Sequence, residues 1–343
     1  MSEEQEIQFN LIPYKGDNIG GAYPDRFDSR DYLYDEEALG AAVEIPIPWE
    51  EEFHVEQKLN HVFKVENQGA SQSCVGQSWQ KYAEILNFIE TGIETDLSAK
   101  FIYSQIYLLP DGGAYIRDGV KVAVDQGVTT EELLPSYKNG EPPDEAYMRR
   151  SQDITEGARK EALTYQGKEY RMLVNGDIDW MARAIMNNAG CVTGARGTSQ
   201  GWGQLEGKVR PPLPGERIWG HAIYCCGFGL DEGKKYIEFI NSWSKLWGKE
   251  GKGRIYEDYF QSGHMFSPWT LTDKPNVEDT MIEIINVEND ERFWAKSIKD
   301  KGIYHIGGWE TYQEGLKAGW FLPVKTVANL EGYEKRNSFG FIK

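Results

Sequence analysis

The pattern of hydrophobic and polar positions predicts a helix in the first third of the chain. Apolar residues recur there at steps of three, four and three, at Trp79, Tyr82, Leu86 and Ile89. This spacing puts them on one face of an amphipathic helix. The segment before them, residues 67–77, is polar and contains glycine. We therefore expect a loop that enters the helix at Cys74, and a helix that runs to about Ile89 and ends at Gly92.

The same pattern places helices before residue 130 and mainly strands after it. Two more helices are expected, over residues 97–109 and 115–125, and a short strand precedes them at residues 62–65. Later strand patterns surround one short helix, with strands at 169–173, 191–193, 222–228, 236–241 and 254–256 and the helix at 178–186. Residues 194–219 are rich in Gly and Pro without periodicity, which predicts a long loop. This order predicts an α+β protein of two packed halves with a cleft between them.

Composition changes towards both ends and predicts three parts. Residues 1–40 form a polar, acidic N-terminal arm, and residues 28–34 either dock its aromatic side chains on the body or belong to a disordered tail. Residues 41–272 form the main domain. Residues 273–343 form a small C-terminal module with a hairpin, residues 292–298 and 303–306, and a helix at 309–318. The alternative for this last part is a C-terminal extension packed on the body.

Composition and charge restrict the function. Hydrophobic residues make up 40% and aromatic residues 13% of the 343 residues, which is typical of a globular protein with a sizeable core. The net charge of −17 argues against a nucleic-acid surface and against binding to anionic membranes. No signal peptide and no apolar run of membrane-spanning length is recognisable.

The four cysteines are too few for a disulfide framework and lack zinc-like spacing, so we expect no metal. A reducing, cytoplasmic compartment is the simplest interpretation. Secretion without a signal peptide and packaging into a particle stay open.

Three residues carry candidate chemistry. Cys74 lies at a predicted helix N-terminus, where free N–H groups and the helix dipole favour the nucleophilic thiolate. His221 begins an apolar strand pattern, and Asn241 ends the next one. If the two strands pair, the Asn241 side chain can accept a hydrogen bond from the His221 imidazole and fix its tautomer. Trp243 could shield that bond from water. Taken singly, each of these residues also has a plain structural role.

Taken together, Cys74, His221 and Asn241 resemble the papain-like cysteine peptidases. Residues 67–74 are similar to that family's loop around the nucleophile, residues 220–222 to its histidine strand and residues 241–253 to its asparagine motif. Residues 97–101, 112–113 and 126–128 are similar to parts of its helical lobe. The resemblance covers roughly residues 28–262. It implies a papain-like two-lobe fold, with a helical lobe and a β-barrel-like lobe, followed by the small C-terminal module of mixed α and β structure.

The resemblance also implies roles for single residues. Cys74 would be the nucleophile, His221 the base that holds the thiolate as an ion pair, and Asn241 the orienting residue. Gln68 would be the side-chain donor of the oxyanion hole, together with the Cys74 backbone N–H. Trp243 would support the site. Candidate substrate-binding residues are Gly112, Gly113 and, at the end of the long loop, Trp219. No cofactor is implied.

The sequence departs from the family pattern at several positions. Ser71 stands where the family usually has a cysteine, which agrees with a chain without disulfides. Val75 replaces an aromatic residue beside the nucleophile, and Ser244 replaces a usual glycine. Residues 1–66 are too short and irregular for the long helical inhibitory pro-segment of many relatives, although the arm could partly serve that purpose.

Two functions from different classes follow. The first is a cysteine-type endopeptidase that acts on proteins or peptides through an acyl-enzyme thioester. The second is a catalytically silent peptide-binding or assembly protein on the same fold, with the C-terminal module as its docking piece for a protein partner. Peptide ligation would use the same residues as hydrolysis. The complete set of Gln68, Cys74, His221 and Asn241 favours the enzyme.

Overall fold

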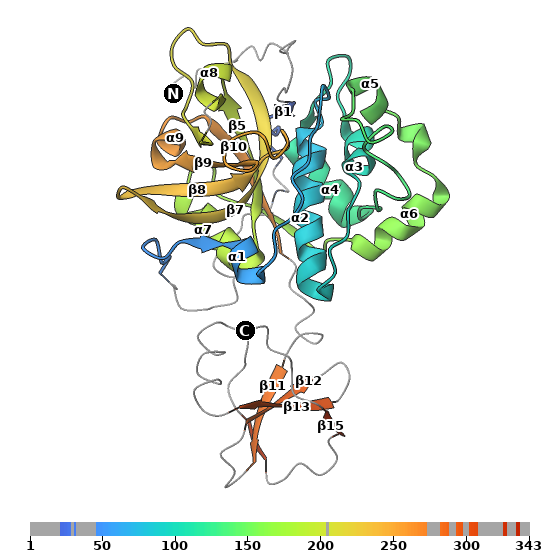
Figure 1. Cartoon of the computed structure of the whole chain (residues 1–343), viewed down its shortest axis with the longest axis vertical. Helices are drawn as coiled ribbons and strands as arrows, with labels where there is room; N and C mark the ends of the chain where they lie inside the picture. The colour runs from blue at the N-terminus through green and yellow to red at the C-terminus, as the bar shows by residue number, and fades with distance from the viewer. Residues whose placement is uncertain are drawn as a thin grey trace. The chain divides into compact units, whose positions relative to one another are not determined.

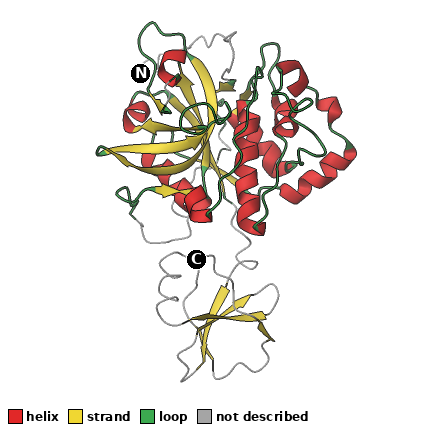
Figure 2. Ribbon diagram, in the orientation of Figure 1, coloured by secondary structure: helices red, strands yellow, loops and turns green. Residues whose placement is uncertain are grey.

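The computed structural model describes residues 21–28, 31, 46–203 and 206–272, together with the strands of the C-terminal part. The chain divides into two compact units, Met1–Asp273 and Lys274–Lys343, and each is described by itself. Figure 1 shows five helices of the first unit, α2 to α6, gathered on one side, and its large sheet with the remaining helices on the other. Figure 2, coloured by secondary structure, makes the same separation visible. The predicted α+β, two-lobe organisation is confirmed.

The helical lobe is built around α2, Cys74–Thr91, whose last residue is followed by Gly92 in the left-handed conformation. α2 contacts α3, Ala99–Ile106, and α4, Ile116–Asp125, and on its other side it contacts strand β7. Two short helices, α5 (Glu145–Met148) and α6 (Glu156–Ala162), and the 3₁₀ turns Ser151–Asp153 and Leu163–Tyr165 complete this lobe. The central position of α2 places its N-terminus between the two lobes (Figure 1).

The β lobe is one eight-stranded sheet. Seven strands follow the order β4-β10-β5-β7-β8-β9-β6, and β2 (Phe53–His54) pairs separately with β7. Their bounds are β4 Tyr170–Met172, β5 Cys191–Gly197, β6 Lys208–Val209, β7 Trp219–Asp231, β8 Lys234–Ile240, β9 Lys252–Tyr256 and β10 Met265–Leu271. The lobe's helices are α1 Val55–Leu59, α7 Ile178–Asn188, α8 Ser199–Trp202 and α9 Glu257–Gln261. β7 pairs antiparallel with β5 on one side and β8 on the other, so it is the centre of this sheet.

The C-terminal unit contains a five-stranded sheet in the order β14-β11-β12-β13-β15. Its strands are β11 Ile282–Val287, β12 Phe293–Ser297, β13 Gly302–Gly307, β14 Lys325–Val327 and β15 Glu334–Arg336. β12 and β13 pair antiparallel, which confirms the predicted hairpin. The helix predicted at residues 309–318 lies outside the described residues.

The predicted strand at residues 62–65 is wrong. Phe63 is buried but Val62 is 73% exposed, and the Phe63 N–H donates to a Glu56 carboxylate oxygen at 2.9 Å instead of to a neighbouring strand. The apolar pattern over residues 62–65 therefore reflects one buried side chain, Phe63, and not a strand. The strand β2 and helix α1, which precede this segment, carry no clear periodicity and were not predicted.

Two further boundaries differ from the prediction. α3 ends at Ile106 and not near Leu109, because residues 108–113 form a turn in which the Gly112 N–H donates to the Leu108 carbonyl at 2.8 Å. The predicted loop over residues 194–219 is partly regular, since β5 continues to Gly197 and both α8 and β6 follow. The buried face of α2 is also shifted, with Val75, Trp79, Tyr82 and Ile85 buried and Ile89 47% exposed. Within the described residues, no helix is both long and apolar enough to cross a bilayer.

Candidate active site

Cys74 is the first residue of α2, directly after Ser73. Its side chain is fully buried, and burial raises the pKa of the thiol to about 11. The backbone N–H groups of Ala222, Gly21 and Val75 act in the opposite direction and favour the thiolate. In this form of the protein, therefore, desolvation outweighs the helix N-terminus, and the thiol is the favoured state. The contact with Ala222 brings the sulfur to the strand that carries His221.

His221 lies in β7, and Asn241 follows the end of β8, the neighbouring antiparallel strand. The His221 Nε2 and the Asn241 Oδ1 are 2.8 Å apart. An Asn oxygen only accepts, so Nε2 is the donor and carries the proton. Nδ1 is buried and has no hydrogen-bond partner among the described residues. Burial lowers the pKa of His221 to about 4, against the opposing effect of Asn241.

Aromatic side chains enclose the imidazole. The ring centroid of Trp243 is 4.6 Å from that of His221, and those of Trp202 and Trp219 are 5.7 Å and 6.2 Å away. All three tryptophans are buried. They exclude water from the bond between His221 and Asn241, which strengthens it. Trp202 was not recognised from the sequence. The substrate-binding role of Trp219 stays a prediction.

Gln68 connects the nucleophile loop to the asparagine segment. Its Nε2 donates to the Ser71 carbonyl at 2.8 Å, and its Oε1 accepts from the Ser242 hydroxyl at 2.6 Å. The Gln68 backbone N–H also donates to the Ser242 carbonyl, at 2.8 Å. The amide is therefore fixed at both ends, and one of its N–H groups donates within the loop that precedes Cys74. Ser242 thus connects Gln68 to the asparagine segment. In the sequence, only its position next to Asn241 pointed to this role.

The backbone at Gly112 and Gly113 forms a turn next to this loop. Their φ angles are 89° and 73°, in the left-handed region that glycine adopts at little cost. The Gly113 N–H donates to the Tyr103 hydroxyl at 2.9 Å. A Cβ at Gly113 would lie 2.4 Å from the Gly21 carbonyl oxygen, so an N-terminal segment passes directly over this glycine.

That segment, residues 21–28 and here called the arm segment, lies across Cys74. Its short strand β1, Ala22–Tyr23, pairs in parallel with β3, Ala114–Tyr115. On the opposite side, a Cβ at Gly220 would lie 2.1 Å from the Ala22 carbonyl oxygen. The arm segment thus touches both lobes, as β1 shows in Figure 1, and its Gly21 N–H contacts the Cys74 sulfur. Of the aromatic residues predicted to dock, Tyr32 and Tyr34 lie outside the described residues.

Asp25 fixes the arm segment to the body. One of its carboxylate oxygens accepts from the Arg117 backbone N–H at 3.0 Å, and the other accepts from the Trp269 indole N–H at 2.7 Å. Its own N–H donates to the Ser267 hydroxyl at 2.8 Å. Burial raises the pKa of Asp25, while these donors oppose the rise. The sequence gives no sign of this anchor, because its partners are far away along the chain.

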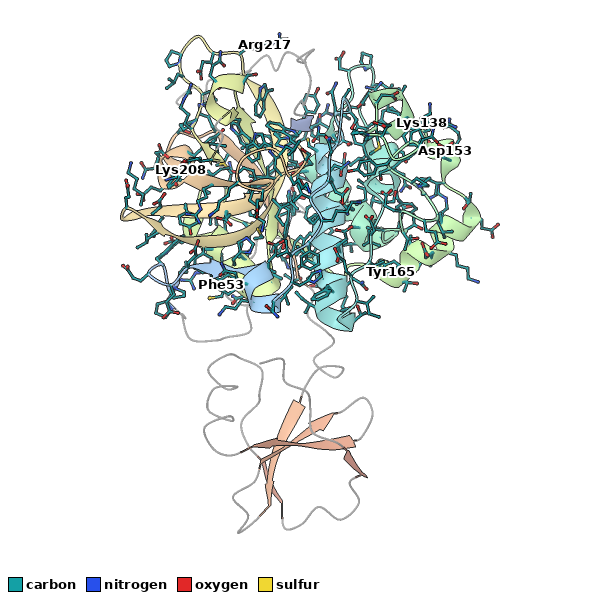
Figure 3. The ribbon with its side chains drawn as sticks, in the orientation of Figure 1. Phe53, Lys138, Asp153, Tyr165, Lys208 and Arg217 are labelled. Carbon is teal, nitrogen blue, oxygen red and sulfur yellow. The ribbon has the colours of Figure 1, made fainter. Side chains whose placement is uncertain are left out.

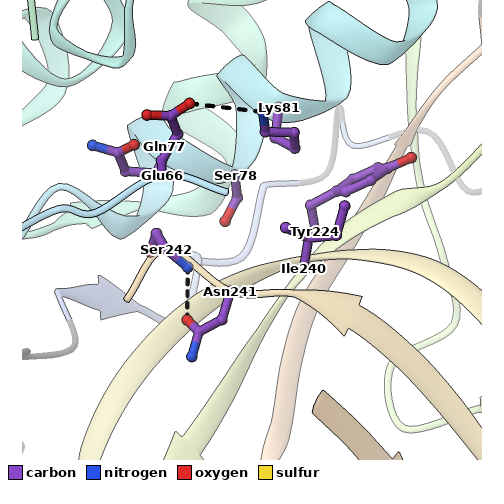
Figure 4. Close-up of a pocket in the computed structure, with 8 residues that line it drawn as sticks. All are labelled: Glu66, Gln77, Ser78, Lys81, Tyr224, Ile240, Asn241 and Ser242. Atoms are coloured by element: carbon purple, nitrogen blue, oxygen red, sulfur yellow. Dashed lines mark hydrogen bonds and ion pairs between the residues drawn. The ribbon is translucent and has the colours of Figure 1, made fainter. Parts of the chain in front are cut away.

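A small pocket lies between α2, the middle of β7 and the end of β8 (Figure 4). It is lined by Glu66, Gln77, Ser78, Lys81, Tyr224, Ile240, Asn241 and Ser242. Beside it, the carboxylates of Glu66, Glu84 and Asp96 come within 4.8 Å of one another, a spacing compatible with a cation. Lys81 pairs with Glu66 and Glu84, however, and Lys64 pairs with Glu66 and Asp96. Two ammonium groups thus already supply the positive charge.

The family model of the papain family cysteine proteases matches residues 49–266, more than half of the sequence. No curated protein matches. Among solved structures, xylellain, a cysteine protease from Xylella fastidiosa, is 24% identical with a TM-score of 0.59 over 74% of this chain and 95% of its own.

Two further structures agree in fold. Procathepsin B S9 from Trypanosoma congolense is 17% identical, with a TM-score of 0.56 over 74% of this chain and 86% of its own. Digestive procathepsin L 3 from Tenebrio molitor is 20% identical, with a TM-score of 0.51 over 66% of this chain and 71% of its own. At these identities the likeness establishes the fold, and the family model establishes the membership. The chain belongs to the papain family of cysteine proteases.

Proposed function

We propose that this cysteine protease is an endopeptidase that hydrolyses peptide bonds through Cys74, His221 and Asn241. The observation that carries the proposal is the pairing of His221 Nε2 with Asn241 Oδ1 at 2.8 Å, which leaves Nδ1 as the basic nitrogen. The contact of the Cys74 sulfur with the Ala222 N–H supports it, because it brings the nucleophile to the residue after His221.

The proposed reaction has two stages. His221 takes the proton of the Cys74 thiol, and the sulfur attacks the scissile carbonyl carbon. The resulting C–N cleavage needs the same proton, which the imidazolium returns to the leaving amine, and a thioester remains on Cys74. A water molecule, deprotonated by His221, then attacks the thioester. The acid product leaves, and the thiol regains its proton.

Gln68 and the Cys74 backbone N–H are the proposed donors to the oxyanion of each tetrahedral intermediate. Support comes from the Gln68 amide, whose position is fixed by Ser71 and Ser242 before any substrate binds. Preorganised donors of this kind need no reorientation as charge develops, and this lowers the barrier. The glycines Gly112 and Gly113 are the proposed contact for the backbone of an extended peptide.

With the arm segment in place, Cys74 is covered. Burial favours a neutral thiol and a neutral imidazole, whereas the proposed reaction needs the thiolate and imidazolium. When the arm segment leaves, water reaches the Cys74 sulfur, and the thiolate of the charge-separated pair becomes more favourable. The proposed catalytic form therefore has the arm segment displaced.

The test is covalent labelling of Cys74 with an epoxide or vinyl-sulfone probe, combined with a peptide-hydrolysis assay. The full chain and its Asp25→Ala variant, in which the arm anchor is lost, should both label at Cys74, and the variant should label faster. Cys74→Ala should abolish labelling and hydrolysis, and His221→Ala should lower both. Peptide binding without labelling or hydrolysis in either protein would instead support the silent binding protein. Products formed with an added amine nucleophile would identify peptide ligation.

Two wider proposals accompany this one. The four free thiols support a reducing, cytoplasmic compartment. The separate five-stranded sheet supports the division into an arm, a catalytic domain over residues 41–272 and a module over residues 273–343, in which the module is the surface for a protein partner.

A further inference from the structure

Glu145, on the short helix α5, contacts the loop that precedes Cys74. Its Oε2 accepts from the Gln72 backbone N–H at 2.6 Å. Its Oε1 accepts from the Tyr103 hydroxyl at 2.5 Å and from the Arg149 Nε at 2.6 Å. Both carboxylate oxygens are therefore used, by partners from three different segments of the helical lobe. Figure 1 shows α5 beside α3, which carries Tyr103.

Tyr103 extends this contact to the glycine turn. Its hydroxyl gives its proton to Glu145, so its lone pairs are directed at the Gly113 N–H, which donates at 2.9 Å. Tyr103 is fully buried, and burial, together with the neighbouring Glu145, raises the pKa of its hydroxyl well above the usual value. The hydroxyl therefore stays protonated, and the direction of both hydrogen bonds is fixed.

Glu145 and Arg149 also contact Gly112, the other residue of the glycine turn. A Cβ at Gly112 would lie 2.4 Å from an Arg149 guanidinium nitrogen and 2.5 Å from a Glu145 oxygen. Arg149 also donates to the Pro110 carbonyl at 3.2 Å, and the Gln72 side chain donates to the Asp111 carbonyl at 2.7 Å. The four cysteines are free, so no disulfide holds the two loops. The hydrogen bonds above and the ion pair of Glu145 with Arg149 connect them instead.

We propose that Glu145 is a positioning residue for the protease reaction. Through Tyr103 it holds the Gly112–Gly113 turn, and through the Gln72 N–H it holds the nucleophile loop, so it fixes the distance between the substrate-backbone contact and Cys74. The proposal rests on the function proposed above. It concerns the part of an extended peptide that lies on the glycine turn and not the chemistry at the sulfur.

Substitutions can separate the contact of Glu145 with Tyr103 from its contact with Gln72. Tyr103→Phe removes only the hydroxyl between Glu145 and Gly113, whereas Glu145→Ala also removes the acceptor for Gln72. Tyr165→Phe makes the same chemical change elsewhere and is the matched control. Figure 3 shows Tyr165 at the opposite end of the helical lobe from α5.

The first measurement is hydrogen exchange at single backbone amides in the full chain, which requires no activity. Tyr103→Phe should speed exchange at Gly113 and leave Gln72 unchanged, and Glu145→Ala should speed both. Tyr165→Phe should change neither. Wild-type protection at Gly113 and Gln72 in the first two variants would overturn the proposal even if the enzyme is active.

The second measurement compares three rates in the same variants: hydrolysis of a peptide with several residues before the scissile bond, hydrolysis of a single-residue ester, and alkylation of Cys74 by iodoacetamide. Loss of one hydrogen bond should lower kcat/KM for the long peptide about tenfold in Tyr103→Phe, mainly through KM. The ester and the alkylation rate should stay at the control value. Equal changes in all three rates would indicate an effect on the arm segment or on folding, and would overturn the proposal. An inactive wild type with the expected exchange pattern would reject the proposed function and leave only the structural link.

Discussion

The strongest prediction concerns the Asp25 anchor of the arm segment. Asp25→Ala removes an acceptor for the Arg117 backbone N–H and for the Trp269 indole, at 3.0 Å and 2.7 Å. Hydrogen bonds to a charged group contribute about 1.5–3 kcal/mol each. The raised pKa of Asp25 shows that burial of its carboxylate opposes this gain, so we take about 2–3 kcal/mol for the pair, below the sum of the two bonds.

This energy acts on the equilibrium between covered and uncovered Cys74. A change of about 2–3 kcal/mol raises the uncovered fraction roughly 30- to 160-fold, as long as that fraction remains small. If opening is fast compared with labelling, the rate of Cys74 alkylation by iodoacetamide rises by the same factor. The rate is measured in the full chain, with the labelled cysteine identified by mass spectrometry, because all four cysteines are buried.

The matched control is Asp125→Ala, which removes an exposed carboxylate at the end of α4. It should label at the wild-type rate. Asp25→Ala should keep the wild-type melting temperature to within a few degrees, because the arm segment contributes little of the core. A wild-type labelling rate in folded Asp25→Ala would refute the reasoning, since the anchor would then not limit access to the thiol.

Three further predictions concern the site and its surroundings. Asn241→Ala should lower kcat roughly 10- to 100-fold, because His221 loses a buried hydrogen bond that sets its tautomer, and steady-state kinetics will show whether KM stays constant. Gln68→Ala should lower kcat on the order of a hundredfold or more with Cys74 alkylation unchanged, and slowed alkylation would mean that the amide positions the thiol instead. Burial raises the pKa of Glu131 to about 7, so the folded protein binds a proton that the unfolded chain releases above about pH 4.5. This contribution to stability is complete below pH 4.5 and lost as the pH rises through 7. Glu131→Gln should therefore raise the melting temperature above pH 7 and leave it unchanged below pH 4.5; equal shifts at both pH values would exclude burial of the charge as the cause.

Much of the site could be predicted because its residues mark the ends of regular elements. Cys74 begins the helix with the clearest periodicity, and His221 lies in the longest apolar strand. The antiparallel pairing of β7 and β8 then places Asn241 beside the imidazole, as the two strand patterns suggested. Local pattern and tertiary geometry agree on where His221 and Asn241 lie, while the catalytic roles of the site residues stay a proposal.

Other parts depend on contacts that no local pattern reports. α5 is four residues long, too short for a helical repeat, and its Glu145 acquires a role only because Tyr103 and Gln72 lie next to it in space. β1 has two residues, and its place depends on hydrogen bonds that the Asp25 carboxylate accepts from residues far along the chain. The false strand at residues 62–65 shows the reverse case, in which a buried ring imitates a strand pattern.

The pairing of β1 with β3 joins two segments of one chain, and this has a consequence for how a substrate competes. Diluting the protein leaves the fraction of covered enzyme unchanged, because both segments are diluted together. A tethered segment acts at an effective local concentration on the order of millimolar. A free peptide present at micromolar concentration must therefore bind much more tightly than the arm segment does in order to displace it. Turnover of scarce substrates would then depend on whatever removes or retains residues 21–28, more than on the abundance of the enzyme.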